Sequence, residues 1–503
     1  MRRTPVVTVW RLVLETASPL SIATGRGDGE RDTVLASDAN GLPFIPASSM
    51  AGVLRALVRA AEPALEGSLF GHLAASDTEL GHMSRLEISH AHVHDSHDRP
   101  VTGLCECVED ALLQPLLHRR NAQRQRVRIN HRGTADDGGL FDRSMLPAGH
   151  RFSVEWVLWS LAEHPPEARL LEALLAQGWL RLGGLTRSGF GLLRAVRGHT
   201  RCFDLRRSED LAAWSALPAD LAAPAEHVLT TPWTPGGSPG TASEPSLGGL
   251  RKLRLTLSPE GGFRFGGGTQ SLREQADSQP NADWAASERR VVWESGRGQL
   301  QALPQAVVPA TGVKGALAHR VAFHAHRLAG EWASSERLLD YDKAVHCPTV
   351  RRLFGSAGDD REATQAGQAR AGVLGFADQW LAVSAQAPQA RQPNQVTPRL
   401  RMHNHIDRFT GGVRDGLLFA SEDLYPCAAS RPLFTLDITL DEPRWRAAGG
   451  EGQDLQALAL AVDDLCSGRL ALGADSAGGL GFFHGQSAWD TGFDWPSQNG
   501  VLG

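Results

Sequence analysis

Residues 45–57 read IPASSMAGVLRAL and residues 308–317 read VPATGVKGAL, so one pattern of strand, turn and helix occurs twice in the chain. We expect Ser48 or Ser49 to cap the first helix and Thr311 to cap the second, because an N-cap hydroxyl accepts a free helix N–H. Apolar residues then recur at the spacing of one helical face: Met50, Val53, Leu54, Leu57 and Val58 in the first copy, Val313, Leu317 and Val321 in the second. The duplicated pattern predicts two domains of one plan.

Four other segments recur in the same order. An apolar strand enters a glycine turn at 12–25 and again at 253–268, and LFG occurs at 69–71 and 353–355. Residues 129–141 match 405–419. Finally, LGGLTRSGFG at 182–191 matches LGADSAGGLG at 472–481. Because common Gly-rich turns explain one or two such matches but not five in order, we predict domains at 1–207 and 249–503. The segment 208–248, rich in Ala, Pro, Ser, Gly and Thr, is typical of a linker.

Each copy reads as a strand, a helix, a long excursion, further strands and a second helix, which we expect at 166–177 and 452–466. This second helix leads into the Gly-rich loop. The order predicts an α+β fold of two ferredoxin-like, split βαβ domains with insertions.

The composition is that of a folded protein and excludes several classes. The chain has 503 residues, 42% hydrophobic and 21% charged, and no apolar run approaches the roughly 20 residues that cross a bilayer. Its six Cys include no C-x-x-C pair, which favours a reducing compartment, the cytoplasm. The net charge of −5 excludes a uniformly basic protein, so nucleic-acid contacts must come from local clusters. No P-loop, HExxH site or Ser-His-Asp elbow occurs.

Three motifs resemble those of a known family. The helix start PASSxxGxLR at 46–55, the LFD element at 140–142 and the loop GGxxxxGxG at 183–191 resemble the RAMP superfamily of CRISPR proteins, in particular the backbone subunits of type III effector complexes, here as a tandem fusion. The resemblance covers about 1–205 and 249–490. It implies a core that grips the guide RNA (crRNA), a thumb-like hairpin that interrupts the guide–target duplex, other complex subunits as partners and, in many members, an acidic residue that cuts target RNA.

The resemblance implies that Asp32 is the cutting residue of the first domain. It lies in a glycine-rich loop together with Asp38, whose sequence DANG is typical of a β-turn. A carboxylate at Asp32 could orient or deprotonate a ribose 2′-OH, or hold a hydrated Mg²⁺ or Mn²⁺ beside the scissile phosphate. Without the resemblance, a solvated loop residue is the simpler interpretation.

The second copy departs from this pattern. The spacing between Asp32 and Pro46 places the equivalent position at Ser295, next to Glu294 and away from any Asp. We therefore expect the second domain to bind RNA without cutting it, with Glu294 and Asp283 as fallback candidates.

Positive charge gathers at 118–132, HRRNAQRQRVRINHR, which holds six Arg and no acid. Arg binds phosphate through two N–H groups and stacks on bases, so this run predicts a guide or target contact; the alternative is a basic surface hairpin without a partner. Helix starts and Gly loops can also seat phosphates through free N–H groups. The residues that we expect to contact RNA are Ser48, Ser49, Arg55, Arg119, Arg120, Arg124, Arg126, Arg128, His131, Arg132, Arg187, Ser188, Thr311, Lys314 and Arg408.

A further group of side chains has the chemistry of zinc ligands: His82, His90, His92, His94, His97, Cys105 and Cys107. The C-x-C pair is tighter than the usual zinc knuckle. Solvated or RNA-facing histidines are therefore the alternative to a structural zinc.

The sequence thus predicts a guide-RNA-binding backbone subunit that cleaves complementary target RNA through Asp32 with a divalent metal ion. One alternative is a non-catalytic guide-RNA scaffold. Another is a guide-processing ribonuclease, which needs a His acid–base group near the Gly loop; His199 is the nearest, and His131 is a second candidate.

Overall fold

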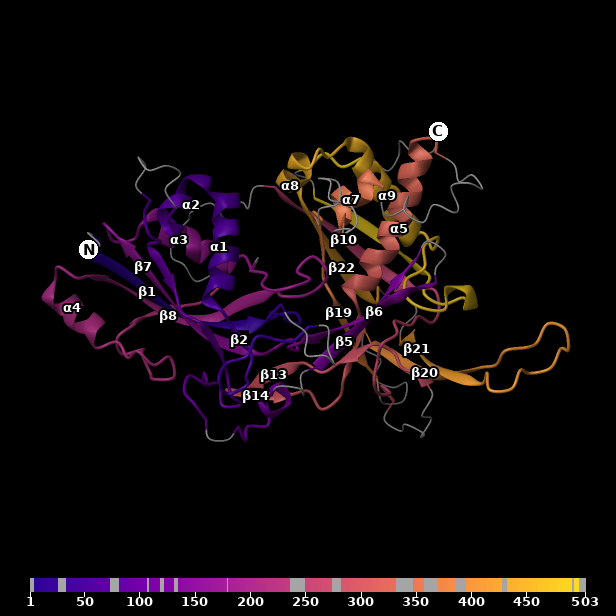
Figure 1. Cartoon of the computed structure of the whole chain (residues 1–503), viewed down its shortest axis with the longest axis horizontal. Helices are drawn as coiled ribbons and strands as arrows, with labels where there is room; N and C mark the ends of the chain where they lie inside the picture. The colour runs from indigo at the N-terminus through magenta and orange to yellow at the C-terminus, as the bar shows by residue number, and fades with distance from the viewer. Residues whose placement is uncertain are drawn as a thin grey trace.

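The computed structural model describes residues 4–25, 33–72, 81–105, 108–117, 122–130, 134–178, 180–235, 249–273, 282–331, 347–356, 370–384, 395–427, 432–490 and 493–496. Over these ranges the chain is a mixed α+β protein, and each half builds an antiparallel sheet with helices packed on it (Figure 1). None of the helices in these ranges is long and apolar enough to span a membrane.

The first sheet is built around β1 (Val6–Thr16), which pairs with β7 (Arg151–Ser160) on one side and β8 (Leu193–Asp204) on the other. Shorter strands extend it: β2 (Phe44–Ile45), β3 (Leu86–Ile88), β4 (Ala91–Val93) and β9 (Thr231–Trp233). The helices packed on it are α1 (Ala47–Ala61), α2 (Pro63–Phe70) and α3 (Pro166–Ala176), and a short turn, η1 (Gln114–Leu116), lies in the excursion.

Alternation of apolar and polar residues explains how this sheet joins its helices. β7 reads RFSVEWVLWS and buries every second side chain, because successive strand residues point to opposite faces. Phe152, Val154 and Trp156 of β7 share one core with Met50 and Leu54 of α1. The apolar face predicted for the first helix is therefore confirmed.

The second sheet repeats this plan. β10 (Leu250–Pro259) pairs with β22 (Phe434–Asp441) and β23 (Phe483–Trp489), and β18 (Leu374–Phe376) lies outside β22. Its helices are α5 (Ala310–Leu328), α7 (Pro348–Phe354), α8 (Glu442–Ala447) and α9 (Gly452–Cys466). Val313, Leu317 and Val321 of α5 are buried in the second core, so the predicted face of this helix is also confirmed. The helices expected at 166–177 and 452–466 are present as α3 and α9.

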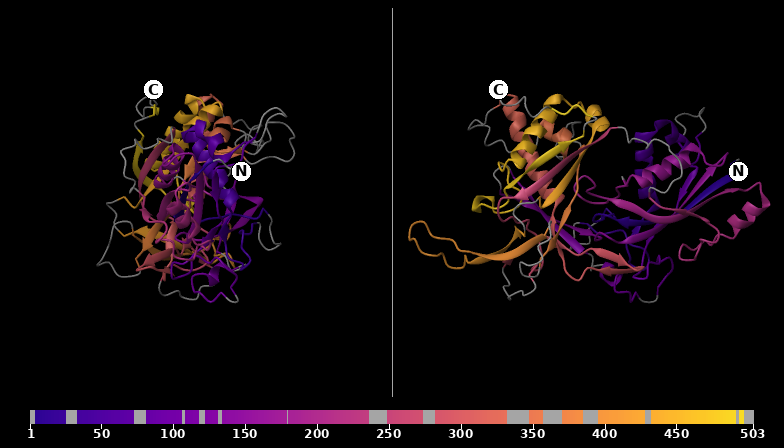
Figure 2. Two further views of the ribbon diagram at one scale, coloured as in Figure 1. Left: turned by 90° about the vertical axis from the view of Figure 1, so that its left-hand side faces the viewer. Right: turned by 180° about the vertical axis from the view of Figure 1, so that it is seen from behind.

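The excursions form further strands on the side away from most of the helices (Figure 1). In the first half, β5 (Ala122–Ile129) and β6 (Ala135–Met145) form a hairpin. In the second half, six strands pair in the order β11-β21-β20-β19-β15-β12: β11 (Ala282–Asp283), β12 (Ser287–Glu288), β15 (Gln305–Val308), β19 (Gln379–Val383), β20 (Gln395–His403) and β21 (Phe419–Pro426). The hairpin of β20 and β21 projects far from the body (Figure 2).

Small elements complete the second half: β13 (Val291–Glu294) with β14 (Arg297–Leu300), β16 (Gly355–Ser356) with β17 (Arg370–Ala371), and the short turn η4 (Ser476–Gly478). The β13–β14 hairpin reaches under the first half (Figure 1).

The segment 208–248, predicted as a linker, is folded over its described part. α4 (Ser208–Ser215) follows β8, and β9 adds to the first sheet. Ala225, Val228 and Leu229 pack with Val7 and Phe203 in a small core of their own. The Pro- and Thr-rich composition concealed this, because three well-spaced apolar residues are enough to dock a segment on a sheet. Residues 236–248 lie outside the described ranges.

The predicted helix caps are wrong. α1 begins after Pro46 and α5 after Pro309, and neither proline provides a side-chain cap. Ser48, Ser49 and Thr311 consequently lie inside the first turn of their helices. The proline explains the shift, because its fixed φ suits helix entry and it has no N–H that needs a partner.

Candidate nucleic-acid interface

The β5–β6 hairpin belongs to the first half in sequence but lies against the second half in space (Figure 1). Arg124 of β5 connects the two: its Nε is 2.8 Å from Glu288 Oε1, and its Nη1 is 2.7 Å from Asp378 Oδ2. All three side chains are at most 11% exposed. Burial alone would lower the pKa of Arg124, but the two carboxylates outweigh it and raise this pKa. The guanidinium that the sequence analysis assigned to RNA is thus occupied by protein carboxylates.

Asp378 also holds the start of α5. Its Oδ1 accepts the N–H of Ala310 at 2.7 Å, while its Oδ2 binds Arg124. Negative charge is favourable there, because the free N–H groups give a helix N-terminus partial positive charge. In the first half, the N–H of Ala47 donates to His90 Nδ1 at 3.1 Å. The first N–H of each helix is therefore bonded within the protein, which limits the phosphate seats predicted at these helix starts.

The loop 182–191 makes a second contact between the halves. Ser188 pairs with Phe376 in a parallel bridge, and the N–H of Phe376 donates to Arg187 O at 3.3 Å. A Cβ at Gly189 would lie 2.4 Å from Asp378 Oδ1, and φ is +96°, so this position requires glycine. Ser188, predicted to contact RNA, is buried in this junction.

A cavity of about 1680 Å³ opens between the β5–β6 hairpin and the second half. Its wall includes both strands, the start of α5 and the segments 265–270, 286–289 and 471–476. Its Arg and Lys side chains are Arg124, Arg126, Arg128, Arg289 and Lys314, and its carboxylates are Glu288 and Asp475. Glu288 is bound by Arg124, and Asp475 by Arg401. The wall therefore has a positive surplus, and its volume exceeds the roughly 300–1,000 Å³ of a small-molecule site.

Three cations account for most of this surplus. Within the described ranges, no carboxylate lies at ion-pair distance from Arg126, Arg289 or Lys314. The Arg126 guanidinium lies 4.9 Å from the centre of the Phe141 ring. The hairpin also exposes apolar side chains, Val127, Ile129, Leu140 and Phe141. Unpaired cations beside exposed apolar groups suit a ligand with both phosphates and bases.

The other predicted RNA contacts are dispersed. Arg128 and Thr311 line the cavity. Arg55 on α1 is paired with Glu66 of α2, and Arg408 is exposed near the end of the β20–β21 hairpin. Five predicted site residues lie outside the described ranges: Asp32, Arg119, Arg120, His131 and Arg132. Arg289 gave no signal in the sequence, because a short basic pair beside an acid forms no charge run.

Backbone pairing aligns the two halves around the loop that precedes each first helix. Leu35 bridges Ala23 in the first half, and Ala285 bridges Gly266 in the second. Leu35 and Ala285 therefore occupy equivalent places. Three positions earlier in the sequence, Asp32 of the first half corresponds to residue 282 of the second.

The second-half counterpart of Asp32 is thus Ala282, with Asp283 beside it, and not Ser295. Counting along the sequence failed because the β13–β14 hairpin is inserted before α5, and Ser295 forms its turn with φ of 49°. Asp283 is exposed, and its Oδ2 lies 3.1 Å from Arg264 Nη1. A divalent cation needs several oxygen ligands, so this carboxylate beside a guanidinium does not fit one. Glu294 lies in the inserted hairpin.

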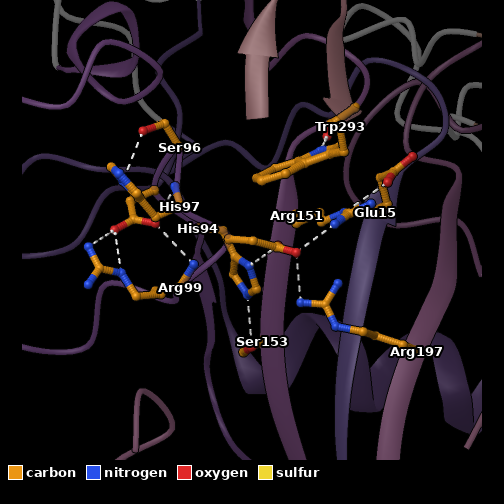
Figure 3. A network of polar contacts seen from close by, with 12 residues as sticks. Glu15, His94, Ser96, His97, Arg99, Arg151, Ser153, Arg197 and Trp293 are labelled. Atoms are coloured by element: carbon orange, nitrogen blue, oxygen red, sulfur yellow. Dashed lines mark hydrogen bonds and ion pairs between the residues drawn. The ribbon is translucent and has the colours of Figure 1, made fainter. Parts of the chain in front are cut away.

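Two of the histidines considered as zinc ligands, His94 and His90, are bound to other residues. The buried His94 lies with Nδ1 2.8 Å from Asp98 Oδ1 and Nε2 2.8 Å from Ser153 Oγ (Figure 3). His90 accepts the N–H of Ala47. Where the structure describes the chain, it contains no group of three His, Cys, Asp or Glu side chains placed to hold a metal ion. Cys107 lies outside the described ranges.

The contacts from Ser153 through His94 to Asp98 have the order of a hydrolytic triad, but the surroundings do not support acyl transfer. Ser153 lies within β7 between β1 and β4, so strand pairing uses the backbone amides that an oxyanion hole would need. Asp98 also pairs with Arg151, and the Trp293 ring lies 4.3 Å above that guanidinium (Figure 3). The network therefore anchors the β13–β14 hairpin on the first sheet.

A comparison with protein-family models agrees with the duplicated plan. The model of the RAMP superfamily matches residues 13–194 and 298–484, one region in each half. No curated protein matches the chain. Among solved structures, a chain of the type III-B Cmr-beta cryo-EM structure of the apo state is similar, with 13% identity and a TM-score of 0.27 over 37% of this chain and 96% of that chain.

Replacing Arg124 by Met is expected to lower the free energy of unfolding by about 3–5 kcal/mol, because Asp378 and Glu288 are then buried without a counter-charge. Urea unfolding of the purified chain measures this. Arg408→Met, the same change at an exposed site, is the control and should alter stability by no more than about 0.5 kcal/mol. Equal losses in both variants would contradict the role assigned to the buried ion pair.

Proposed function

The chain belongs to the RAMP superfamily, whose model matches both of its halves, and from this we propose that it is a backbone subunit of a type III CRISPR effector complex. In this proposal it binds guide RNA and the paired target RNA in the cavity between its halves. The basic, partly apolar wall of that cavity is the observation that carries the proposal.

The chemistry of the wall supports RNA as the ligand. Each nucleotide brings one phosphate charge, so the cations Arg126, Arg289 and Lys314 can bind phosphates of the RNA backbone. The exposed Phe141 offers a surface on which a base can stack. Because the whole chain has a net charge of −5, RNA would be attracted to this local field and not to the surface at large.

The proposal treats each half as one RAMP domain with a ferredoxin-like core, at 1–207 and 249–503, joined by 208–248. The strand orders β4-β7-β1-β8 and β18-β22-β10-β23 support it, because the two halves arrange equivalent strands in the same sequence. The cysteines in the described ranges are free thiols, which suits the reducing cytoplasm.

A partner subunit is proposed for the β20–β21 hairpin. The β5–β6 hairpin of the first half lies on the second half, and the equivalent hairpin of the second half would lie on the next subunit of the complex. Its exposed apolar side chains support this: Met402, Ile406, Phe409, Val413, Leu417, Leu418 and Phe419.

Cleavage of target RNA is proposed for Asp32, on the basis of the resemblance. The carboxylate would orient or deprotonate the ribose 2′-OH that attacks the scissile phosphate. A bound Mg²⁺ would supply charge stabilisation at that phosphate. In the second half, the pairing of Asp283 with Arg264 supports binding without cutting. A guide-processing role for His199 is less well supported, because this residue lies within β8, paired on both sides.

RNA binding is expected to weaken about tenfold in Arg289→Ala, because one phosphate contact is lost. For the same reason, the slope of the logarithm of the binding constant against the logarithm of the salt concentration should fall in magnitude by about one. Fluorescence anisotropy with a short single-stranded RNA at several salt concentrations measures both quantities. The control is Arg254→Ala, which removes an exposed Arg paired with Asp437 outside the cavity and should leave the affinity unchanged. If both variants bind like the wild type, the cavity is not the RNA site.

In the assembled complex with Mg²⁺, Asp32→Ala is expected to abolish one or more cuts in RNA complementary to the guide while both RNAs still bind. Gel analysis of labelled target measures the cuts. Asp283→Ala is the matched control and should leave the pattern unchanged. An unaltered pattern in Asp32→Ala would leave the chain as a non-catalytic guide-RNA scaffold.

A further inference from the structure

The junction between the halves holds more positive than negative charge. The cations that meet there are Arg124, Arg126, Arg143, Arg181, Arg187 and Lys314, and the carboxylates paired with them are Glu288, Asp378 and Asp441. Arg124 binds the first two carboxylates, and Arg187 donates to Asp441 at 2.9 Å. In the described part of the chain, the other four cations have no carboxylate partner.

These four cations have few hydrogen-bond acceptors. Arg126 Nε is buried and has no acceptor among the described residues. Arg181 Nη1 donates a long bond of 3.4 Å to Thr186 O. Arg143 packs against the glycine loop, where a Cβ at Gly184 would lie 2.6 Å from its Nη1. Of the four, Arg126 and Lys314 also line the cavity, where a ligand can supply the missing acceptors.

The unpaired cations are close enough to repel one another. Burial lowers the pKa of Lys314, and the charges of Arg187 and Arg126 lower it further. Burial also lowers the pKa of Arg126 to about 10, with Arg143 and Arg124 adding to the effect. Arg126 stays charged at neutral pH, and such repulsion is stronger in a partly buried site than in water.

We propose that a phosphate group binds between Arg126 and Lys314 and completes the contact between the two halves of the chain. Where the phosphate belongs to an RNA backbone, this inference rests on the proposed function. Both side chains line the cavity, so a strand in the cavity can place a phosphate between them. Phosphate suits the site because several of its oxygens accept hydrogen bonds at once from a guanidinium and an ammonium group.

A consequence for stability follows from where the two cations lie. Arg126 is on β5 of the first half, and Lys314 is on α5 of the second. Without an anion their repulsion opposes docking of the hairpin, whereas a bound phosphate attracts both. Binding of the anion and docking of the halves therefore stabilise each other, by the linkage that any ligand of the folded state obeys.

The test compares thermal unfolding of the full chain with and without inorganic phosphate, and with and without a short single-stranded RNA. Lys314→Met removes the charge and keeps the volume of the side chain. Lys252→Met is the matched control, because Lys252 lies on β10 beside Asp437, away from the junction. Arg126→Gln repeats the test from the other half should Lys314→Met fail to fold.

Wild type and Lys252→Met are expected to unfold at higher temperature when phosphate or RNA is added. Lys314→Met should be at least as stable as wild type without an anion, because a repulsion is removed, and should lose the stabilisation by phosphate. Its RNA dissociation constant should rise about tenfold, as for one lost charged contact.

The outcomes separate this inference from the proposed function. If wild type binds RNA, but phosphate and RNA stabilise Lys314→Met and Arg126→Gln as much as wild type, the phosphate site is refuted and the RNA cavity stands. If phosphate stabilises wild type and not the variants while no RNA binds, the anion site stands and the proposed function fails. The site is also refuted if Lys314→Met unfolds at a lower temperature than wild type without an anion and is still stabilised by phosphate as much as wild type.

Discussion

The ion pair of Arg124 with Glu288 and Asp378 determines how the two halves of this chain meet. It draws the β5–β6 hairpin across the start of α5, and Asp378 holds that helix start as well. The cavity exists because the hairpin lies there, and the unpaired cations Arg126 and Lys314 both line it for the same reason. A buried charge trio thus shapes the surface that we propose for RNA.

The two halves differ in the carboxylates that bind Arg124, although they share one plan. Asp378 follows β18 and holds the start of α5, whereas His90 takes the corresponding place at α1. Counted from the paired residues Leu35 and Ala285, Glu288 corresponds to Asp38, whose carboxylate instead accepts N–H groups of its own turn. The second half therefore has a pair of carboxylates that binds an arginine, and the first half does not. The hairpin of the first half can dock on the second half in this way, but not the reverse.

Periodicity and repetition predicted the parts of the fold that local rules control: the apolar faces of α1 and α5 and the second helix of each half. The predicted caps were wrong, because each helix begins after a proline. The fold of 208–235 and the second-half position equivalent to Asp32 did not follow from the sequence, because a docked segment and an inserted hairpin have their effect only in three dimensions. For the candidate site, the sequence indicated that 118–132 is basic. Strand alternation places Arg124 and Arg126 on the same face of β5, so only the contacts across the junction decide that Arg124 binds carboxylates while Arg126 stays unpaired. Arg143 and Arg181 gave no signal, since each stands apart from other basic residues in the chain.

Ultraviolet crosslinking of bound guide RNA to the chain, followed by mass spectrometry, tests the central claim most directly, because it reports which residues touch the RNA. We expect crosslinked peptides from 124–129, 286–289 and 311–319, which line the cavity in both halves. Crosslinks confined to other surfaces, such as α4 or the edge at β9, would contradict the account.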